Sequence, residues 1–310
     1  MISVIICTYN RARYIYNVLK SIAQGTFPAE GYEIVLVDNN CTDNTRTEVD
    51  RFCKDFPEVS LRYFTETLQG LSHARNRGIT ESQGDILVYV DDDATVNPEY
   101  LTAYSEWFTA NPDTDAAGGP IIPHYETGQE PEWMTYFIKR LLTGYLYFGK
   151  KSGPFPGDNY PGGGNAAYRR SVFDRVGLYN VELGRSGDSL AGGEEKDIFD
   201  KMKRENMKFV YLPDAILYHS IPAYKLEADY FNRLTVSIGE SERARTLRIG
   251  RKAYRKRLLS ECKKWCATLI LWLYYLVTFR MGRGNMLIRF RSNVTKGLTG
   301  KNAPQAKTRS

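Results

Sequence analysis

Apolar and polar residues along the first third of the chain follow a pattern of strands and helices in turn. Short apolar runs end in polar residues, as buried strands do, and each is followed by a segment with apolar residues at helical spacing. The expected strands are residues 2–7, 31–40, 59–64 and 85–90, and the expected helices are residues 13–24, 43–54, 72–82 and 98–110. This alternation predicts an α/β fold with a mostly parallel sheet and helices on both faces.

The pattern is less regular after residue 118. Residues 119–169 are rich in glycine, proline and aromatic side chains, which predicts long loops over a cleft. The run NYPGGGNAAYRRSVFDRVG, residues 159–177, predicts a glycine-rich loop that leads into a short helix. A helix is expected to start within residues 192–202, followed by two short extended pieces within 208–222 and a helix at 225–238.

The charged residues are distributed unevenly along the 310-residue chain. Residues 243–310 contain 18 Lys or Arg and a single acid, Glu261, whereas residues 1–242 contain 24 Lys or Arg and 35 Asp or Glu. A basic segment attached to an acidic body is expected to bind anionic partners, either phospholipid or nucleic acid.

One uncharged run lies inside the basic segment. Residues 265–279, WCATLILWLYYLVTF, are flanked by Lys263 and Lys264 on one side and by Arg280 and Arg283 on the other. As a helix this run is about 22 Å long, shorter than the hydrocarbon layer of about 30 Å. Its Trp and Tyr residues are typical of the headgroup level, so the run predicts an interfacial helix with basic flanks rather than a span. The alternative is a helix covered by the rest of the chain or by a second copy in a homodimer.

The start of the chain and its cysteines indicate a reducing compartment. The first residues, MISVIICTYN, lead directly into a strand pattern without a basic region or a cleavage site of small residues. The five cysteines form neither a CxxC pair nor a zinc-like spacing with histidine. Both observations predict a cytoplasmic protein with free thiols.

Polar clusters follow three of the expected strands, at residues 8–11, 38–40 and 91–93. Parallel α/β sheets bind ligands beyond the carboxyl ends of their strands, where these clusters are expected to meet. The third cluster consists of three adjacent aspartates, Asp91, Asp92 and Asp93. Neighbouring carboxylates repel one another and are costly in a partly dry site, so a positive group is expected to compensate them.

Two kinds of chemistry fit the three aspartates. Asp91-x-Asp93-x-Thr95 matches the nucleophile motif of haloacid-dehalogenase-type phosphatases, which also need Mg²⁺. That hypothesis requires a later apolar strand ending in paired aspartates, and none follows residue 97. The second hypothesis is a nucleoside-diphosphate-sugar site, in which one aspartate binds a divalent cation and its neighbour bonds the ribose.

Seven short motifs favour the second hypothesis when they are taken in order. They are SVIICTYNR, EIVLVDNNCTDNT, GLSHARNRGI, ILVYVDDDA, GGGNAAYRRSVF, GGEEKD and YHS. Each is weak alone, but over residues 2–240 the ordered set resembles the family 2 inverting glycosyltransferases with a GT-A fold. The resemblance implies a Rossmann-like catalytic domain that uses a nucleotide sugar, with UDP expected, together with Mn²⁺ or Mg²⁺.

The resemblance also implies roles for individual residues. Tyr9 would stack on the nucleobase and Asp38 would accept a hydrogen bond from a base N–H, which suits uracil. Arg75 would offer a cation near the base or diphosphate, and Gly163 would let the backbone approach the donor sugar or acceptor. The other implied positions are Cys7 and Arg11 at the nucleotide, Asp91 as support, Asp92 at the ribose, and Asp93 with His219 at the metal. His219 is equally compatible with a buried histidine bonded to the backbone.

The catalytic base is expected in the motif GGEEKD. Inverting transfer is a single displacement in which a carboxylate takes the proton of the acceptor hydroxyl. Relatives usually carry Glu-Asp here, and this chain has Glu194-Glu195, so Glu195 aligns with the base. Glu194 and Asp197 are the alternatives. Acids are also favoured at a helix start by the dipole alone.

These inferences predict a catalytic domain over residues 1–240, a basic helical extension over 241–292 and a flexible tail over 293–310. The expected protein is a metal-dependent hexosyltransferase on the inner face of the membrane, acting on a glycan or lipid-linked acceptor in cell-surface polysaccharide synthesis. A non-catalytic binder of anionic polymers is a third hypothesis. Nucleic acid is not an expected partner, because the basic stretch lacks interleaved aromatic and glycine residues.

Overall fold

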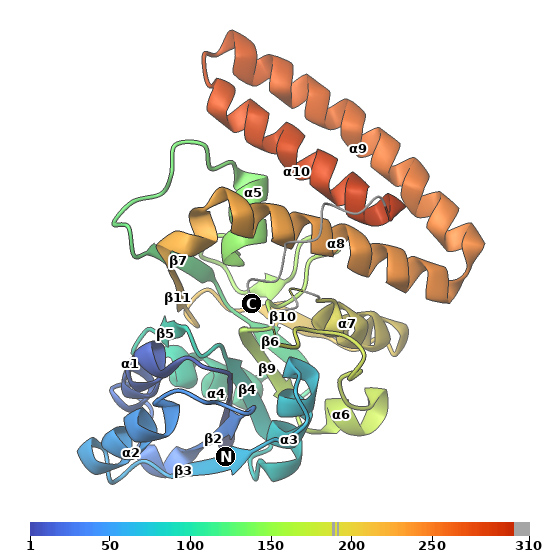
Figure 1. The fold of residues 1–310 in the computed structure, drawn as a ribbon. Coiled ribbons are helices and arrows are strands. Elements are labelled where there is room, and N and C mark those ends of the chain that lie inside the picture. Colours follow the sequence, from blue (N-terminus) through green and yellow to red (C-terminus); the bar gives the residue numbers. More distant parts are fainter. Residues whose placement is uncertain (188–189, 191, 301–310) are drawn as a thin grey trace. The chain divides into compact units, whose positions relative to one another are not determined.

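The computed structural model describes residues 1–187, 190 and 192–300, and the chain forms two compact units (Figure 1). The α/β unit comprises residues 1–124, 143–187 and 193–220. The helical unit comprises the described parts of residues 125–142, 188–192 and 221–310. The sequence predicts a boundary near residue 240, whereas the chain passes between the units several times and leaves the α/β unit for the last time after residue 220.

An eight-stranded sheet forms the centre of the α/β unit. Its strands run in the order β3-β2-β1-β4-β9-β6-β10-β8, and β8 and β9 are antiparallel to their neighbours while the other strands are parallel to one another. The strands are β1 (Ile2–Thr8), β2 (Tyr32–Asp38), β3 (Leu61–Thr65), β4 (Ile86–Val90), β6 (Ala116–Gly118), β8 (Gly153–Pro154), β9 (Asn165–Arg169) and β10 (Phe209–Tyr211). A smaller sheet has the order β5 (Ala94–Val96), β11 (Leu217–Ile221) and β7 (Ile121–Tyr125).

Helices cover both faces of the large sheet because alternate strand residues point to opposite sides. Val4 and Ile6 of β1 join one apolar core, whereas Ile5 joins the other, and all three are fully buried. The first core also contains residues of α1 (Ala12–Ala23), α2 (Thr45–Asp55) and α4 (Tyr100–Ala110). The second contains residues of α3 (Leu71–Glu81), α6 (Ser171–Val176) and α7 (Glu194–Arg204). The expected mostly parallel α/β fold is confirmed.

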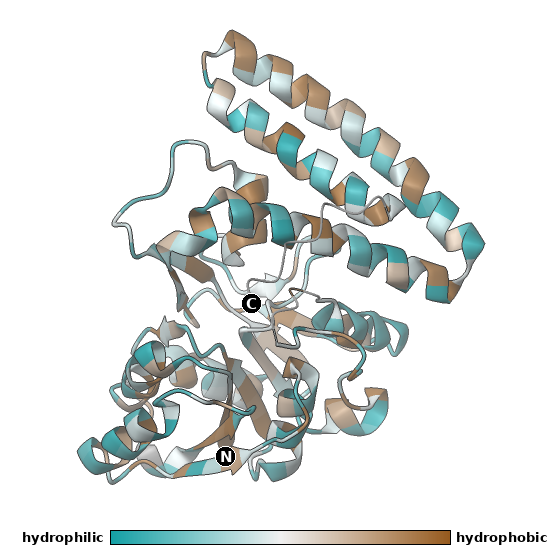
Figure 2. Cartoon of the chain, viewed as in Figure 1, coloured by the Kyte–Doolittle hydropathy of each residue, from teal (hydrophilic) through white to brown (hydrophobic). Residues whose placement is uncertain are grey.

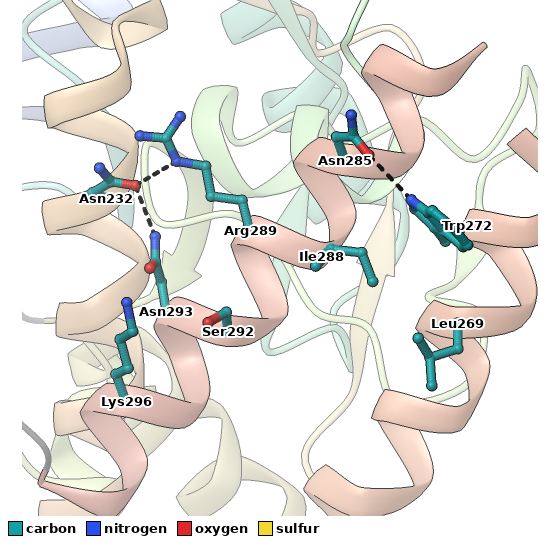
Figure 3. A pocket seen from close by; sticks show the side chains of 9 residues that line it. All are labelled: Asn232, Leu269, Trp272, Asn285, Ile288, Arg289, Ser292, Asn293 and Lys296. Atoms are coloured by element: carbon teal, nitrogen blue, oxygen red, sulfur yellow. Dashed lines mark hydrogen bonds between the residues drawn. The ribbon is translucent and has the colours of Figure 1, made fainter. Parts of the chain in front are cut away.

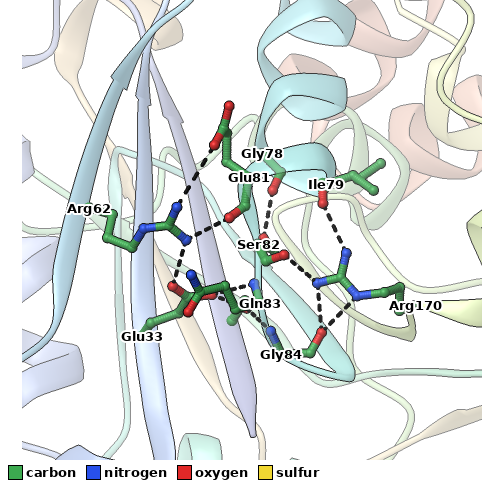
Figure 4. A network of polar contacts seen from close by, with 10 residues as sticks. Glu33, Arg62, Gly78, Ile79, Glu81, Ser82, Gln83, Gly84 and Arg170 are labelled. Carbon is green, nitrogen blue, oxygen red and sulfur yellow. Dashed lines mark hydrogen bonds and ion pairs between the residues drawn. The ribbon is translucent and has the colours of Figure 1, made fainter.

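A polar network ties the amino ends of the strands together (Figure 4). The buried carboxylate of Glu33 accepts hydrogen bonds from the Ser3 hydroxyl at 2.7 Å, the Gln83 N–H at 2.6 Å and the Arg62 guanidinium at 3.1 Å. Arg170 donates from three nitrogens to backbone carbonyls between Ile79 and Gly84, so it closes the turn between α3 and β4.

The helical unit is built around three long helices. It contains α5 (Tyr136–Thr143, whose last residue belongs to the α/β unit), α8 (Ala228–Ile249), α9 (Arg251–Val277) and α10 (Met281–Thr299). Its core contains Met134, Ile138, Leu142, Tyr230, Phe231, Leu234 and Leu287. Helices α8 and α10 cross so closely that a Cβ on Gly239 would lie only 2.2 Å from the Val294 carbonyl oxygen. Figure 2 shows apolar and polar bands in turn along α9 and α10.

The structure corrects two predictions about the C-terminal segment. Residues 293–299 belong to α10, where Val294 and Leu298 are buried, so they are not a flexible tail; residues 301–310 lie outside the described part. The helix expected over 265–279 is only the last part of a longer helix, α9, which ends at Val277. Within the described ranges, every helix is too short or too polar to cross a membrane.

The region of residues 119–169 is more ordered than the sequence predicts. It contains β7, α5, β8 and β9, and β9 follows the glycine run directly and separates it from the short helix α6. β9 has the sequence NAAYR and the neighbouring β6 is only AAG, so neither shows the long apolar run by which a strand is recognised.

Candidate active site

The polar strand ends meet at one edge of the large sheet, as expected. Thr8 at the end of β1 is in register with Asp38 at the end of β2, and β4 lies on the other side of β1. The chain passes from β1 toward β3 on one side and returns to β4 on the other, so the switch point of the sheet lies between β1 and β4. This is where ligands bind in doubly wound sheets.

The three aspartates immediately follow β4 and are buried to different extents. Asp93 is 6% exposed, and Asp91 and Asp92 are partly buried. Burial and repulsion from Asp93 raise the pKa of Asp91, and the same two causes raise the pKa of Asp92 to about 7. The cluster is therefore poorly compensated by the protein itself, although Arg11 lowers the pKa of Asp92 and lies 3.9 Å from Asp93.

Asp93 and His219 form a pair suited to a cation. His219 Nε2 lies 3.3 Å from Asp93 Oδ1, and its Nδ1 lies 2.7 Å from the Thr143 carbonyl oxygen. A carbonyl oxygen only accepts, so Nδ1 carries a proton and a neutral ring presents its Nε2 lone pair to the carboxylate. A divalent cation between these two atoms would satisfy both, and the carbonyl contact is of the kind that orients ligand histidines. Among the described residues, no three His, Cys, Asp or Glu side chains converge as a complete metal site.

The residues expected at the nucleobase lie at the ends of β1 and β2. Tyr9 is 40% exposed, which leaves its ring available for stacking. Asp38 is held in place, since its Oδ1 accepts from the Cys41 N–H at 2.6 Å and its Oδ2 accepts from the Tyr63 hydroxyl. Burial raises the pKa of the Cys7 thiol to about 12, so this group is a neutral part of the wall rather than a nucleophile.

The acids of GGEEKD begin α7 and differ in their partners. The Arg75 guanidinium bridges Glu194 and Glu195, with nitrogen–oxygen distances of 2.9 Å to each. Arg75 and Glu194 are nearly fully buried, whereas the Glu195 side chain is 32% exposed. Burial and the charge of Glu195 raise the pKa of Glu194. Asp197 is paired with Lys201 at 2.8 Å.

This arrangement places Arg75 differently from the expectation. The sequence suggested a cation at the nucleobase or diphosphate, but the buried guanidinium holds the two candidate base residues. Glu195 is thus fixed at one oxygen and accessible at the same time, unlike Glu194, which is buried, and Asp197, which is neutralised by its lysine.

The glycine run lies against acids from two different elements. A Cβ on Gly163 would lie 1.8 Å from Glu195 Oε1, and a Cβ on Gly164 would lie 2.0 Å from Asp91 Oδ2. Real side chains do not approach this closely, so these positions exclude any residue larger than glycine unless the acids move. The backbone of this loop therefore connects the aspartate cluster to the start of α7.

Asn165, which follows the run, is a residue that the sequence reasoning missed. It is fully buried, accepts hydrogen bonds from the Tyr100 and Tyr104 hydroxyls at 2.8 and 2.6 Å, and donates to the carbonyls of Pro120 and Ala215 at 2.9 Å each. A polar residue inside the run GGGNAA was the available signal. Its four partners anchor the glycine loop to α4 and to the loops before β7 and β11.

The α/β fold, with helices on both faces of a large central sheet, is that of the GT-A glycosyltransferases, as comparison with solved structures shows. The mannosyltransferase PcManGT of Pyrobaculum calidifontis, solved in complex with GDP-Man and Mn²⁺, is similar in fold with a TM-score of 0.62 at 20% identity, over 97% of this chain and 88% of that one. Staphylococcus aureus TarS 1-349, solved in complex with UDP, has a TM-score of 0.50 at 18% identity, over 96% and 91%.

The family model described as glycosyl transferase family 2 matches residues 3–177, more than half of the chain, and the chain belongs to this family. It is 27% identical over 235 residues to the glucosyl-dolichyl phosphate glucuronosyltransferase of Haloferax volcanii, covering 74% of this chain and 72% of that protein. It is 25% identical over 314 residues to the succinoglycan biosynthesis protein ExoM of Rhizobium meliloti, covering 95% and 92%. The protein is thus a glycosyltransferase, and the phosphatase interpretation of Asp91-x-Asp93-x-Thr95 has no support.

Proposed function

We propose that this glycosyltransferase transfers a sugar from a nucleoside diphosphate, with UDP expected, to a glycan or lipid-linked acceptor with inversion at the anomeric carbon. The observation that carries the proposal is that two different kinds of acid lie at the carboxyl ends of the strands, one suited to bind a cation and one suited to accept a proton. Asp93 and His219 form a pair that fits a cation. Glu195 is fixed by Arg75 beside Gly163, and the next residue, Gly164, lies against Asp91 of the aspartate cluster.

The donor would lie across the switch point. Tyr9 and Asp38 would contact the uracil, Asp92 the ribose, and Cys7 and Arg11 would border the nucleotide, while Asp91 supports the glycine loop through Gly164. Mn²⁺ or Mg²⁺ held by Asp93 and His219 would neutralise the diphosphate, whose oxygens and water would supply the remaining ligands. Both carboxylate and imidazole are ligands that Mn²⁺ accepts.

Glu195 would act as the general base. Its carboxylate accepts the proton of the acceptor hydroxyl as that oxygen attacks the anomeric carbon and the bond from this carbon to the diphosphate oxygen breaks. The electron pair of the broken bond leaves with the nucleotide, and attack from the opposite side inverts the configuration. Arg75 is a positioning residue, because it holds the carboxylate of Glu195 from the buried side.

The acceptor and the location follow from the relatives and the basic segment. One relative is named for a dolichyl phosphate substrate and another for succinoglycan biosynthesis, so a lipid-linked glycan of the cell surface is the proposed acceptor. Residues 265–279, which begin in the second half of α9, and the basic residues around them would hold the enzyme on the anionic inner face of the membrane. A homodimer through the same helix is the alternative use of this surface.

Calorimetric titration of UDP into the protein, with and without Mn²⁺, tests the nucleotide site. We expect UDP to bind only with the metal and Asp93→Ala to lose this binding. Asp85→Ala is the matched control at the other end of β4, where the carboxylate is 88% exposed, and it should bind as the wild type does. Binding of GDP instead of UDP would show that the uracil contact assigned to Asp38 is wrong. If no nucleoside diphosphate binds with any divalent cation, the proposed donor site is wrong.

A further inference from the structure

A groove of about 750 Å³ lies on the helical unit, bounded by side chains of α8, α9 and α10 (Figure 3). Its two halves differ in chemistry. Asn232 of α8 faces Arg289, Asn293 and Lys296 of α10 in the polar half. The apolar half contains Leu269 and Trp272 of α9 and Ile288 of α10.

The polar half holds two cations, Arg289 and Lys296, that are not neutralised by any acid in the described part of the chain. Arg289 donates from Nε to the Asn232 amide oxygen at 2.8 Å, so an amide rather than an acid holds the guanidinium, and Asn293 donates to the same oxygen at 2.9 Å. Neither Arg289 nor Lys296 has a carboxylate within ion-pair distance in residues 1–187, 190 and 192–300.

A neighbouring arginine on the same helix shows the contrast. Arg291 of α10 and Arg257 of α9 both bind the buried Glu261, at 2.9 and 2.7 Å. The unit therefore pairs Arg257 and Arg291 with a buried acid, whereas Arg289 at the groove is held by a neutral amide. A cation held by a neutral amide at the edge of a cavity is suited to an anionic ligand.

The apolar half continues onto an exposed stripe of α9. Leu269, Leu273 and Leu276 follow one another at spacings of four and three residues, so they lie on one helix face with Trp272. They are 48%, 52% and 37% exposed. The Trp272 Nε1–H donates to the Asn285 amide oxygen at 3.1 Å, which fixes the ring at the groove wall. A ligand anchored at Arg289 would thus meet an apolar path on its other side.

We infer that the groove binds the phosphate of a membrane phospholipid, with the phosphate at Arg289 and Lys296 and the acyl chain along Leu269 and Trp272. This inference rests on the membrane setting of the proposed function and adds a defined site to it. Charge complementarity selects an anion, and the continuous apolar stripe selects a lipid over a soluble phosphate. A helix pair that lies at the headgroup level, without a span, presents such a groove at the depth of lipid phosphates.

Co-sedimentation of the full chain with vesicles, without nucleotide, tests this site. The vesicles contain phosphatidylcholine with or without phosphatidylglycerol, at low and at high salt. The double variant Arg289→Gln/Lys296→Gln is compared with Lys252→Gln/Lys256→Gln, which removes the same charge from exposed positions of α9. We expect the groove variant to bind phosphatidylglycerol vesicles at least tenfold more weakly than the control variant. High salt should preserve this difference, because salt screens diffuse attraction more than direct contacts.

Titration with a short-chain phosphatidylglycerol and with inorganic phosphate separates the two sources of the anion. Tighter binding of the lipid supports the inference, and equal binding of inorganic phosphate overturns it. Equal loss in both double variants also overturns it, because general charge would then explain the binding. A change of oligomeric state with unchanged vesicle binding would assign the groove to a second copy instead. Lys296→Gln alone, at an exposed residue, should reproduce the effect in part if the double variant does not fold.

Measuring how the groove variant binds UDP with Mn²⁺ distinguishes a failure of this inference from a failure of the proposed donor site. The variant should bind the nucleotide as the wild type does, which also shows that it is folded. If the wild type binds vesicles through the groove but no nucleotide, the donor proposal fails and the lipid site stands.

Discussion

Buried carboxylates at the two ends of the strands of the large sheet, here called its amino edge and its carboxyl edge, have pKa values shifted in opposite directions. At the amino edge, burial would raise the pKa of Glu33, but hydrogen bonds from Ser3, Gln83 and Arg62 outweigh it and hold the pKa below its usual range. At the carboxyl edge, burial and mutual repulsion raise the pKa of Asp91 and Asp92. Hydrogen bonds within the protein therefore keep Glu33 ionised, whereas Asp91 and Asp92 still require a positive charge from a ligand despite the nearby Arg11.

The comparison predicts that acids at the carboxyl edge serve activity and those at the amino edge serve stability. The largest expected effect is that of Glu195→Gln, which keeps the shape of the side chain and removes the base. Transfer should fall by a factor of about 10² to 10⁴, the usual contribution of a general base. The measurement is the rate of sugar transfer at saturating donor, alongside UDP and Mn²⁺ affinity, which should change little.

Asp200→Asn, an acid further along α7, is the matched control and should transfer normally. Asp197→Asn tests the remaining alternative in the motif. Full activity of Glu195→Gln together with a large loss in Asp197→Asn would move the base to Asp197, despite its pairing with Lys201.

The same comparison shows which parts of the site the sequence could predict. The strands ending at Thr8, Asp38 and Val90 were predictable because each is an apolar run followed by polar residues, and parallel strands bring such ends together. The pairing of Asp93 with His219 was suggested by the family resemblance, and the two side chains do lie together.

The remaining features depend on contacts between distant residues, which no local pattern records. Arg75 and Glu194 are 119 positions apart, and nothing near Arg75 in the sequence indicates that it is buried against α7 rather than open to a nucleotide. The order of residues 293–299 was missed for a similar reason. A short segment ending in polar residues resembles a tail, and its helix is stabilised by the close crossing of Gly239 and Gly297.

A smaller effect is expected at the amino edge. Glu33→Gln replaces the carboxylate that accepts from Ser3, Gln83 and Arg62 with a neutral amide. The amide nitrogen cannot accept, so at least one of these donors loses its acceptor. Loss of a buried, charge-assisted partner of this kind costs about 2 kcal/mol of unfolding free energy. Urea unfolding at neutral pH measures it, and UDP binding by the folded variant should equal that of the wild type. Reduced nucleotide affinity at unchanged stability would contradict the separation of the two edges.

The smallest effects are opposite pH slopes at two glutamates. The pKa of Glu33 is lowered by folding, so its stabilisation relative to Glu33→Gln is present above the unfolded value of about 4.3 and is lost as the pH falls through the folded pKa. The pKa of Glu194 is raised, by burial and by Glu195, so its contribution is present below about 4.3 and is lost as the pH rises.

Urea unfolding of the wild type, Glu33→Gln and Glu194→Gln from acidic to neutral pH therefore gives two difference curves. The wild type should gain stability relative to Glu33→Gln as the pH rises toward the unfolded pKa of about 4.3. It should lose stability relative to Glu194→Gln as the pH rises above that value. If both curves slope in the same direction, Glu194 is compensated by Arg75 as fully as Glu33 is by Arg62. Glu194 would then belong with the structural acids of the amino edge, and Glu195, which is 32% exposed, would be the accessible carboxylate held by the same arginine.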